Sequence, residues 1–173
     1  MQKVLLAVIG TVAIAALGFA VAGLASSGSS SGVFAGTSEE TSESTTETVK
    51  PTVWTAVLRT GQEVPKPKGV KAGAAGTFKV TVTKKGSSNS AKYTLSFRKL
   101  TGRAVAAHIH KGKRGKAGPV VVGLCGPCTS GRGGTKSIPK AVFEAMTSGS
   151  AYVNVHTAKN PAGEIRGQVT KVS

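Results

Sequence analysis

Histidine is the residue type in this chain best suited to chemistry, and the 173 residues contain three of them. His108 and His110 lie one residue apart within residues 104–112, and His156 lies within residues 152–157. Both stretches alternate as β-strands do, so His108 and His110 should project from one face of a strand, about 7 Å apart at their α-carbons. Joined by His156, they would form a nitrogen ligand set that suits copper or zinc.

Two interpretations of these histidines stay open. In the first, His108, His110 and His156 hold a single Cu or Zn ion, with Glu164 as a candidate fourth ligand. In the second, the imidazoles form a hydrogen-bonded patch between strands that binds no metal. That polar network would also include Asn154, Glu164 and Arg166. Alternation places Asn154 on the same face as His156, and Glu164 on the same face as Arg166.

Conventional enzyme chemistry is not expected, and no catalytic residue is assigned. The chain contains no Asp, so it has no Ser-His-Asp set, and its folded part offers no paired carboxylates. The His-x-His strand before a Gly-rich loop is faintly similar to copper/zinc superoxide dismutase. Dismutase activity is rejected, because that enzyme's paired metals need more histidines and an Asp. The protein is therefore predicted not to be an enzyme.

Cys125 and Cys128, in Cys-Gly-Pro-Cys, are the only cysteines. A thioredoxin-like redox motif would need a strand-to-helix setting that this Gly-rich stretch does not offer. One such pair is also half of a four-thiolate zinc site. A local disulfide is favoured, because it is the default in an exported protein.

The first 50 residues predict export. Residues 4–25 are almost wholly apolar and follow Lys3, which is typical of a signal peptide, but the run is long enough to remain as a membrane anchor. Residues 26–50 are rich in Ser, Thr and Glu and predict a disordered linker. Residues 51–173 should form the folded domain. The protein is therefore expected to be secreted or held at the cell surface, with the N-terminal segment in the membrane if it is not cleaved.

The folded part is strongly basic. The whole chain carries a formal charge of +16, and residues 51–173 hold 21 Lys and Arg against three Glu, a net +18. Lys111, Lys113, Arg114 and Lys116 form one basic cluster, which predicts binding to anionic envelope or matrix polymers. No aromatic residues are interleaved with these charges, so specific nucleic-acid binding is not expected.

Strand patterns dominate the folded part. Seven strands are predicted, at residues 52–59, 76–84, 92–98, 104–110, 119–124, 151–156 and 164–172. Residues 125–136 are predicted to be a Gly-rich loop, and residues 138–149 a short helix that opens at Pro139 and stops at Gly149. The spacing of strands and turns indicates an all-β antiparallel sandwich or barrel.

Several motifs in a fixed order resemble the signature of the CHRD domain, a family named for chordin and found in many bacterial exported proteins. The motifs are Gly-Gln-Glu-Val-Pro at 61–65, Ala-His-Ile-His-Lys-Gly at 107–112, Gly-Pro-Val-Val-Val at 118–122, Val-Asn-Val-His-Thr at 153–157 and Gly-Glu-Ile-Arg-Gly-Gln at 163–168. The resemblance covers residues 54–169. It implies an immunoglobulin-like Greek-key sandwich or barrel, and it supplies no reaction.

These observations predict an exported, non-enzymatic CHRD-domain protein that acts as a binding or structural module at the cell surface or outside the cell. The alternative is a metal-binding protein that takes Cu or Zn through the three histidines. The sequence indicates neither the natural partner nor the oligomeric state.

Overall fold

The computed structural model describes residues 50–85 and 88–172. The signal or anchor predicted for residues 1–25 and the linker predicted for residues 26–50 lie outside the described residues, apart from Lys50. Within the described ranges, no helix is long and apolar enough to cross a membrane.

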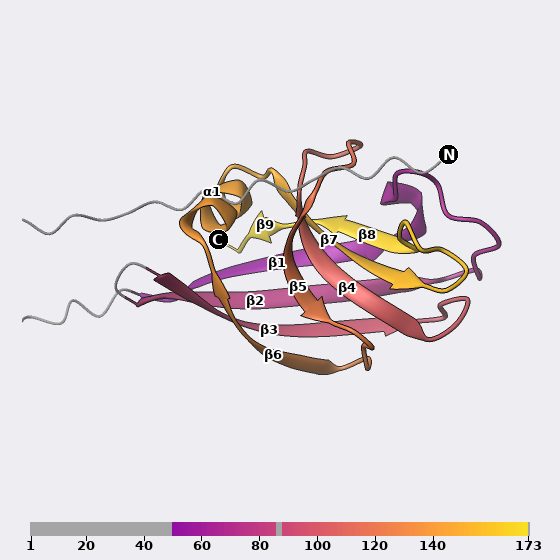
Figure 1. Ribbon diagram of the computed structural model, residues 1–173, viewed down its shortest axis with the longest axis horizontal. Helices are drawn as coiled ribbons and strands as arrows, with labels where there is room; N and C mark the ends of the chain where they lie inside the picture. Colours follow the sequence, from indigo (N-terminus) through magenta and orange to yellow (C-terminus); the bar gives the residue numbers. More distant parts are fainter. Residues whose placement is uncertain (1–49, 86–87, 173) are drawn as a thin grey trace, which may run out of the picture. The chain divides into compact units, whose positions relative to one another are not determined.

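Strands make up most of the described residues, as the alternating sequence patterns predict (Figure 1). In chain order the elements are β1 (Thr52–Arg59), the 3-10 turn η1 (Thr60–Gln62), β2 (Ala75–Lys85), β3 (Ser88–Arg98), β4 (Ala104–Lys111), β5 (Val120–Cys125), β6 (Arg132–Ile138), α1 (Lys140–Thr147), β7 (Ala151–Thr157), β8 (Ile165–Gln168) and β9 (Thr170–Lys171).

All strand pairs are antiparallel, and the strands follow the order β5-β4-β7-β8-β1-β2-β3-β6, with β9 paired to β1. The sheet curls until its edge strands β5 and β6 approach each other. On β3, next to β6, the buried Tyr93 hydroxyl donates to the Leu124 carbonyl on β5 at 2.6 Å. The result is a nearly closed barrel. The predicted all-β antiparallel fold with one short helix is confirmed.

The barrel interior holds the apolar half of each alternating strand. Trp54, Phe78, Leu95, Ile109 and Ile165 are all 1% exposed or less. The helix α1 packs three buried residues, Val142, Ala145 and Met146, toward this core. The ring of Phe143, also on α1, meets the ring of Trp54 edge-on at 5.3 Å. Burial of this kind is the main favourable contribution to folding.

Strand β7 differs from the others because all seven of its residues are buried. It lies between β4 and β8, and its apolar face, with Val153 and Val155, belongs to the core. Its polar face is buried as well, because loops at residues 111–118 and 157–163 fold over it. The strand that carries His156 is therefore held from both sides.

The prediction of a loop over residues 125–136 is wrong in its second half, where β6 begins at Arg132. This strand pairs with β3 at the edge of the sheet and is mostly exposed, so it has no apolar alternation to reveal it. Gly133 permits the pairing, because a Cβ there would lie 1.9 Å from the Tyr93 carbonyl oxygen. The strand predicted over residues 164–172 is likewise divided, into β8 and β9 on either side of Val169. The described residues thus form nine strands, where seven were predicted.

Candidate metal site

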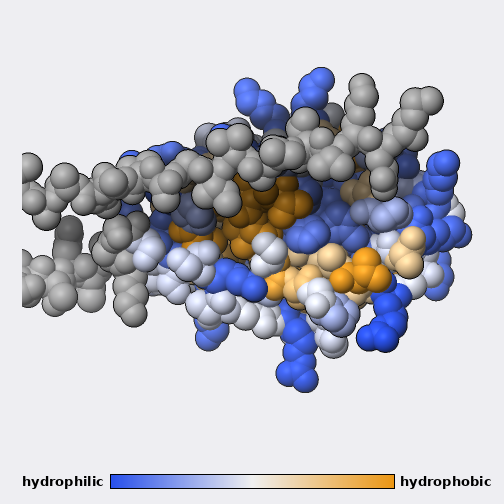
Figure 2. Space-filling model, in the orientation of Figure 1, coloured by the Kyte–Doolittle hydropathy of each residue, from blue (hydrophilic) through white to orange (hydrophobic). Residues whose placement is uncertain are grey.

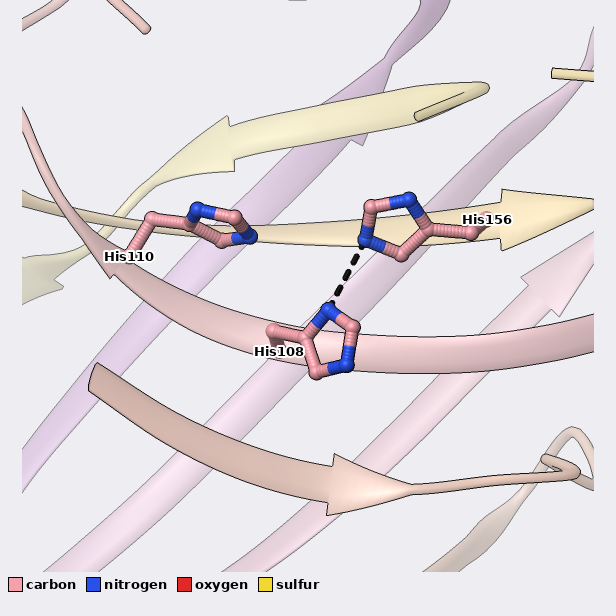
Figure 3. Close-up of side chains that lie close together, drawn as sticks. All are labelled: His108, His110 and His156. Atoms are coloured by element: carbon pink, nitrogen blue, oxygen red, sulfur yellow. Dashed lines mark hydrogen bonds between the residues drawn. The ribbon is translucent and has the colours of Figure 1, made fainter. Parts of the chain in front are cut away.

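Two neighbouring strands bring the three histidines together. On β4, His108 lies opposite Asn154 of β7 and His110 lies opposite Tyr152, while His156 lies opposite Ala106. Because side chains alternate along each strand, all three imidazoles project from the same side of the β4–β7 pair (Figure 3). One ring nitrogen of each histidine lies within 4.8 Å of the chosen nitrogens of the other two. In a tetrahedral zinc site, ligand nitrogens lie about 3.3 Å apart, so a small contraction would close the set around an ion.

Backbone carbonyls set the orientation of two of the rings. The Nδ1 atom of His110 lies 2.8 Å from the Gly118 carbonyl oxygen, and the Nδ1 atom of His156 lies 2.9 Å from the Pro161 carbonyl oxygen. A carbonyl can only accept, so both Nδ1 atoms carry the proton and both Nε2 atoms keep a free lone pair. This arrangement is the usual support for a metal-binding histidine.

The Nε2 atom of His110 is buried and makes no hydrogen bond of normal geometry among the described residues, although the Asn154 side chain lies close enough to act on the pKa of this ring. Leaving a buried polar atom unpaired costs free energy, so such atoms are rare in folded proteins. In Figure 3 the ring of His110 directs this nitrogen toward the ring of His156. A lone pair held in this position can coordinate an ion placed in the space among the three rings.

His108 completes the cluster and is its most accessible member, since it is half-buried whereas His110 and His156 are each 7% exposed. Its Nδ1 lies 3.0 Å from the Nε2 of His156. Because that Nε2 is an acceptor, His108 donates the proton of this bond. Metal uptake would require the His108 proton to move to Nε2, which frees Nδ1 as the third ligand.

Burial lowers the pKa of all three histidines below the ordinary value of 6.5, because a charged imidazole is poorly solvated inside the protein. Repulsion from the neighbouring histidines lowers the pKa of His108 and His156 further, and Arg166 does the same to His110. The three rings are therefore neutral at neutral pH, which is the protonation state that binds metals.

A stack of side chains covers the site. The ring of Tyr152 lies nearly parallel to that of His110 at 4.8 Å, and the guanidinium of Arg166 sits 3.3 Å above the Tyr152 ring. Arg166 also donates to the carbonyls of Lys113 and Lys116 at 3.0 and 2.8 Å. These contacts fix the basic loop over the site, and with it the Gly118 carbonyl that orients His110.

Glu63 is a further buried residue near the site, and it is not among the residues predicted from the sequence. It is 1% exposed, and both its carboxyl group and the Asn154 side-chain amide crowd the α-carbon of Gly163, where a Cβ would lie 2.6 Å from the Glu63 Cδ and 2.8 Å from the Asn154 Nδ2. Burial raises its pKa to about 7, although the Val64 amide and Arg166 act to lower it. Its position in the Gly-Gln-Glu-Val-Pro motif, in a domain with only three acids, was the available signal.

Several buried polar atoms in this region have no hydrogen-bond partner in the described part of the chain. Besides the His110 Nε2, they are Glu63 Oε2, Asn154 Oδ1 and Arg166 Nη1. Asn154 and Arg166 act on the pKa values of both Glu63 and His110, so these side chains are close neighbours. Each of these residues thus keeps one polar atom without a well-aligned partner, although Asn154 interacts with both Glu63 and His110.

Glu164, predicted as a fourth ligand and as a partner of Arg166, lies elsewhere. Its carboxylate accepts from the Thr101 amide at 2.7 Å, from the Thr101 hydroxyl, from the Thr157 hydroxyl at 2.6 Å and from the Asn160 amide at 3.2 Å. Although burial raises its pKa, these bonds outweigh burial and hold the pKa below its usual value. In the described residues, no hydrogen bond joins Glu164 to a histidine or to Arg166. The predicted single network is therefore two separate ones.

The remaining predicted site residues are also placed. Cys125 and Cys128 form a disulfide, with their sulfur atoms 2.10 Å apart, at the end of β5. Lys111, at the end of β4, and the loop residues Lys113, Arg114 and Lys116 are all exposed. Arg114 donates to the Gln62 side chain at 3.3 Å, which brings this loop beside the loop that follows β1.

Comparison with known families agrees with the motifs found in the sequence. The family model described as CHRD domain matches residues 54–169, well over half of the chain. The chain belongs to the CHRD domain family. The CHRD span runs from β1 to Val169 and contains all three histidines and Glu63. Searches of curated proteins and of solved structures found no match.

The buried Glu63 should give this CHRD domain a pH-dependent stability. In the folded state its pKa of about 7 lies above the ordinary 4.5, so stability is lost as pH rises from about 4.5 to 7, by about 3 kcal/mol. Glu63→Gln removes the ionisable group. Relative to wild type, this variant should gain that amount in free energy of unfolding between pH 4.5 and pH 8, measured by urea denaturation.

The three histidines give the opposite trend, since stability falls as pH drops below 6.5 when folded pKa values are lowered. They are common to both proteins, so the difference between variant and wild type isolates Glu63. Glu144→Gln, on the exposed surface of α1, is the matched control and should show no such trend. A constant difference between Glu63→Gln and wild type at all pH values would contradict the prediction.

Proposed function

We propose that this CHRD protein is an exported, non-enzymatic binding module and that its ligand is a copper or zinc ion. The observation that carries the proposal is the buried, unpaired Nε2 of His110 beside two further imidazoles. A purely structural cluster would be expected to pair this atom, as it pairs the Nδ1 atoms of His110 and His156. Imidazole is a ligand that both copper and zinc accept.

The surrounding structure supports the proposal in two further ways. The carbonyls of Gly118 and Pro161 hold two of the rings so that their Nε2 lone pairs face the shared space. The lowered pKa values keep the rings neutral, so no proton competes strongly with the ion at neutral pH. The chain's own residues would bind and orient the ion, and no reaction step is assigned to them.

Titration of Cu(II) and Zn(II) into the purified protein tests the proposal. Wild type should bind one ion per chain, and the His108→Ala/His110→Ala variant should bind at least 100-fold more weakly, because two of three ligands are lost. Lys111→Ala, an exposed change on the same strand, is the matched control and should retain binding. Equally weak heats for wild type and the double variant would refute the metal site.

Export is the second part of the proposal, and it is supported by the apolar run at residues 4–25 after Lys3. The protein isolated from its native host should lie outside the cytoplasm, either cleaved near residue 22 or 25 or held in the membrane by an intact N-terminus. N-terminal sequencing of protein from separated cell fractions checks this. An intact N-terminus found only in the soluble cytoplasmic fraction would contradict export.

The basic loop favours a second ligand class, an anionic envelope or matrix polymer. Lys113, Arg114 and Lys116 are exposed, and Arg166 fixes the backbone of this loop. The loop backbone therefore loses little conformational entropy on binding. Hydrophilic residues also project around the rim of the domain face drawn in Figure 2, while hydrophobic residues lie toward its middle. The net charge of +18 on residues 51–173 would draw a polyanion to this surface.

Retention on immobilised heparin measures this second interaction. The Lys113→Gln/Arg114→Gln/Lys116→Gln variant should elute at clearly lower salt than wild type. A variant with the same loss of charge on β2 and β3, Lys79→Gln/Lys84→Gln/Lys92→Gln, should elute close to wild type. Equal elution of the two variants would mean that only total charge matters, and retention that persists at about 1 M salt would exclude a charge-driven interaction altogether.

A further inference from the structure

The histidine cluster offers an ion three neutral ligands and no negative charge. Within the described residues, the cluster of close candidate ligands contains histidines alone. The two cysteines are bonded to each other, so no thiolate is available. Glu164 is occupied by hydrogen bonds from Thr101, Thr157 and Asn160. The ligands would therefore not neutralise any of the charge of an ion bound here.

Positive groups predominate around the cluster, although the buried carboxyl of Glu63 also lies beside Asn154, which is opposite His108. The buried guanidinium of Arg166 lies on the Tyr152 ring, which in turn lies on the His110 ring. Arg166 also bonds the backbone carbonyls of Lys113 and Lys116, so the loop that carries these exposed cations is held next to the Arg166 side chain. A divalent ion would meet twice the repulsion that a monovalent ion meets at the same place.

The number of ligands points in the same direction. Zn(II) in proteins is almost always four-coordinate and tetrahedral, and Cu(II) favours square-planar or tetragonal sets. Three imidazoles from two adjacent strands supply neither arrangement by themselves, so Zn(II) here would need water as its fourth ligand, as it has in open three-histidine sites. Cu(I), which has a filled d shell and one positive charge, is satisfied by two or three ligands. His110 and His156 are each only 7% exposed, whereas His108 is half-buried. An additional ligand would therefore have to approach the ion beside His108.

Resting on the proposed metal site, we propose that the three-histidine cluster selects Cu(I) over Zn(II) and Cu(II). The protein would then carry reduced copper, held by His108, His110 and His156 in a three-coordinate site without a counter-charge. This assigns both the element and its oxidation state to a site that the ligand types alone leave open to either metal.

Competition against a coloured chelator for each ion, at pH 7 and without oxygen for Cu(I), tests the preference on the purified protein. Cu(I) should bind one ion per chain and at least 100-fold more tightly than Zn(II), with Cu(II) also weaker than Cu(I). Ag(I), which is monovalent and does not change oxidation state under these conditions, should follow Cu(I). Tighter or equal binding of Zn(II) or Cu(II) overturns the preference but leaves the metal site standing. Binding of none of the ions overturns the site itself.

Neutralising nearby charge tests the physical reason. Arg166→Gln should raise the affinity for Zn(II) by a larger factor than the affinity for Cu(I), because the divalent ion gains more from the loss of a positive neighbour. Arg166 is buried and its replacement can impair folding, so the exposed Lys113→Gln/Arg114→Gln/Lys116→Gln variant provides the same comparison on a folded protein. Equal changes for both ions in that variant would show that charge does not set the preference.

Discussion

The antiparallel pairing of β4 with β7 determines where every imidazole of the site lies. Register places His108 opposite Asn154 and His110 opposite Tyr152, and it leaves His156 diagonal to His108. A slip of one residue would turn a whole strand over and send its histidines into the core. The apolar faces, with Ile109 on β4 and Val153 and Val155 on β7, prevent that slip because all three are 1% exposed or less. The hydrophobic core thus fixes the polar site on its other side.

Two loops orient the histidine rings that the strands bring together. The loop of residues 111–118 supplies the Gly118 carbonyl to His110, and the turn of residues 157–163 supplies the Pro161 carbonyl to His156. Tyr152 bonds the Gly118 amide and supports Arg166, which in turn bonds the basic loop. Each loop is therefore anchored to the strand whose polar face it covers. The same contacts that cover the site also orient the lone pairs.

Sequence periodicity could predict the shared face of His108 and His110, because a two-residue period is a local property of the chain. It could not predict partners that depend on long-range pairing or turns. Glu164 and Arg166 share a spacing that suggests one face, but Glu164 lies before β8, next to the turn at Gly163, and bonds Thr101 instead. The contacts of Glu63 arise only from the packing of the β1–β2 loop. The edge strand β6 could not be predicted from the sequence, because its exposed, Gly-rich residues show no apolar alternation.

The pKa shifts around the site share one physical origin. Burial lowers the pKa values of the histidines and raises that of Glu63 to about 7, because the same low-polarity interior disfavours a charge of either sign. Near neutral pH the histidines are therefore free of the protons that would block a metal. Glu63 also lacks much of the negative charge that would balance one. An ion entering this space meets free lone pairs and little compensation for its own charge. As a proposed metal site, it would distinguish ions first by how much charge they carry, and only then by the geometry they prefer.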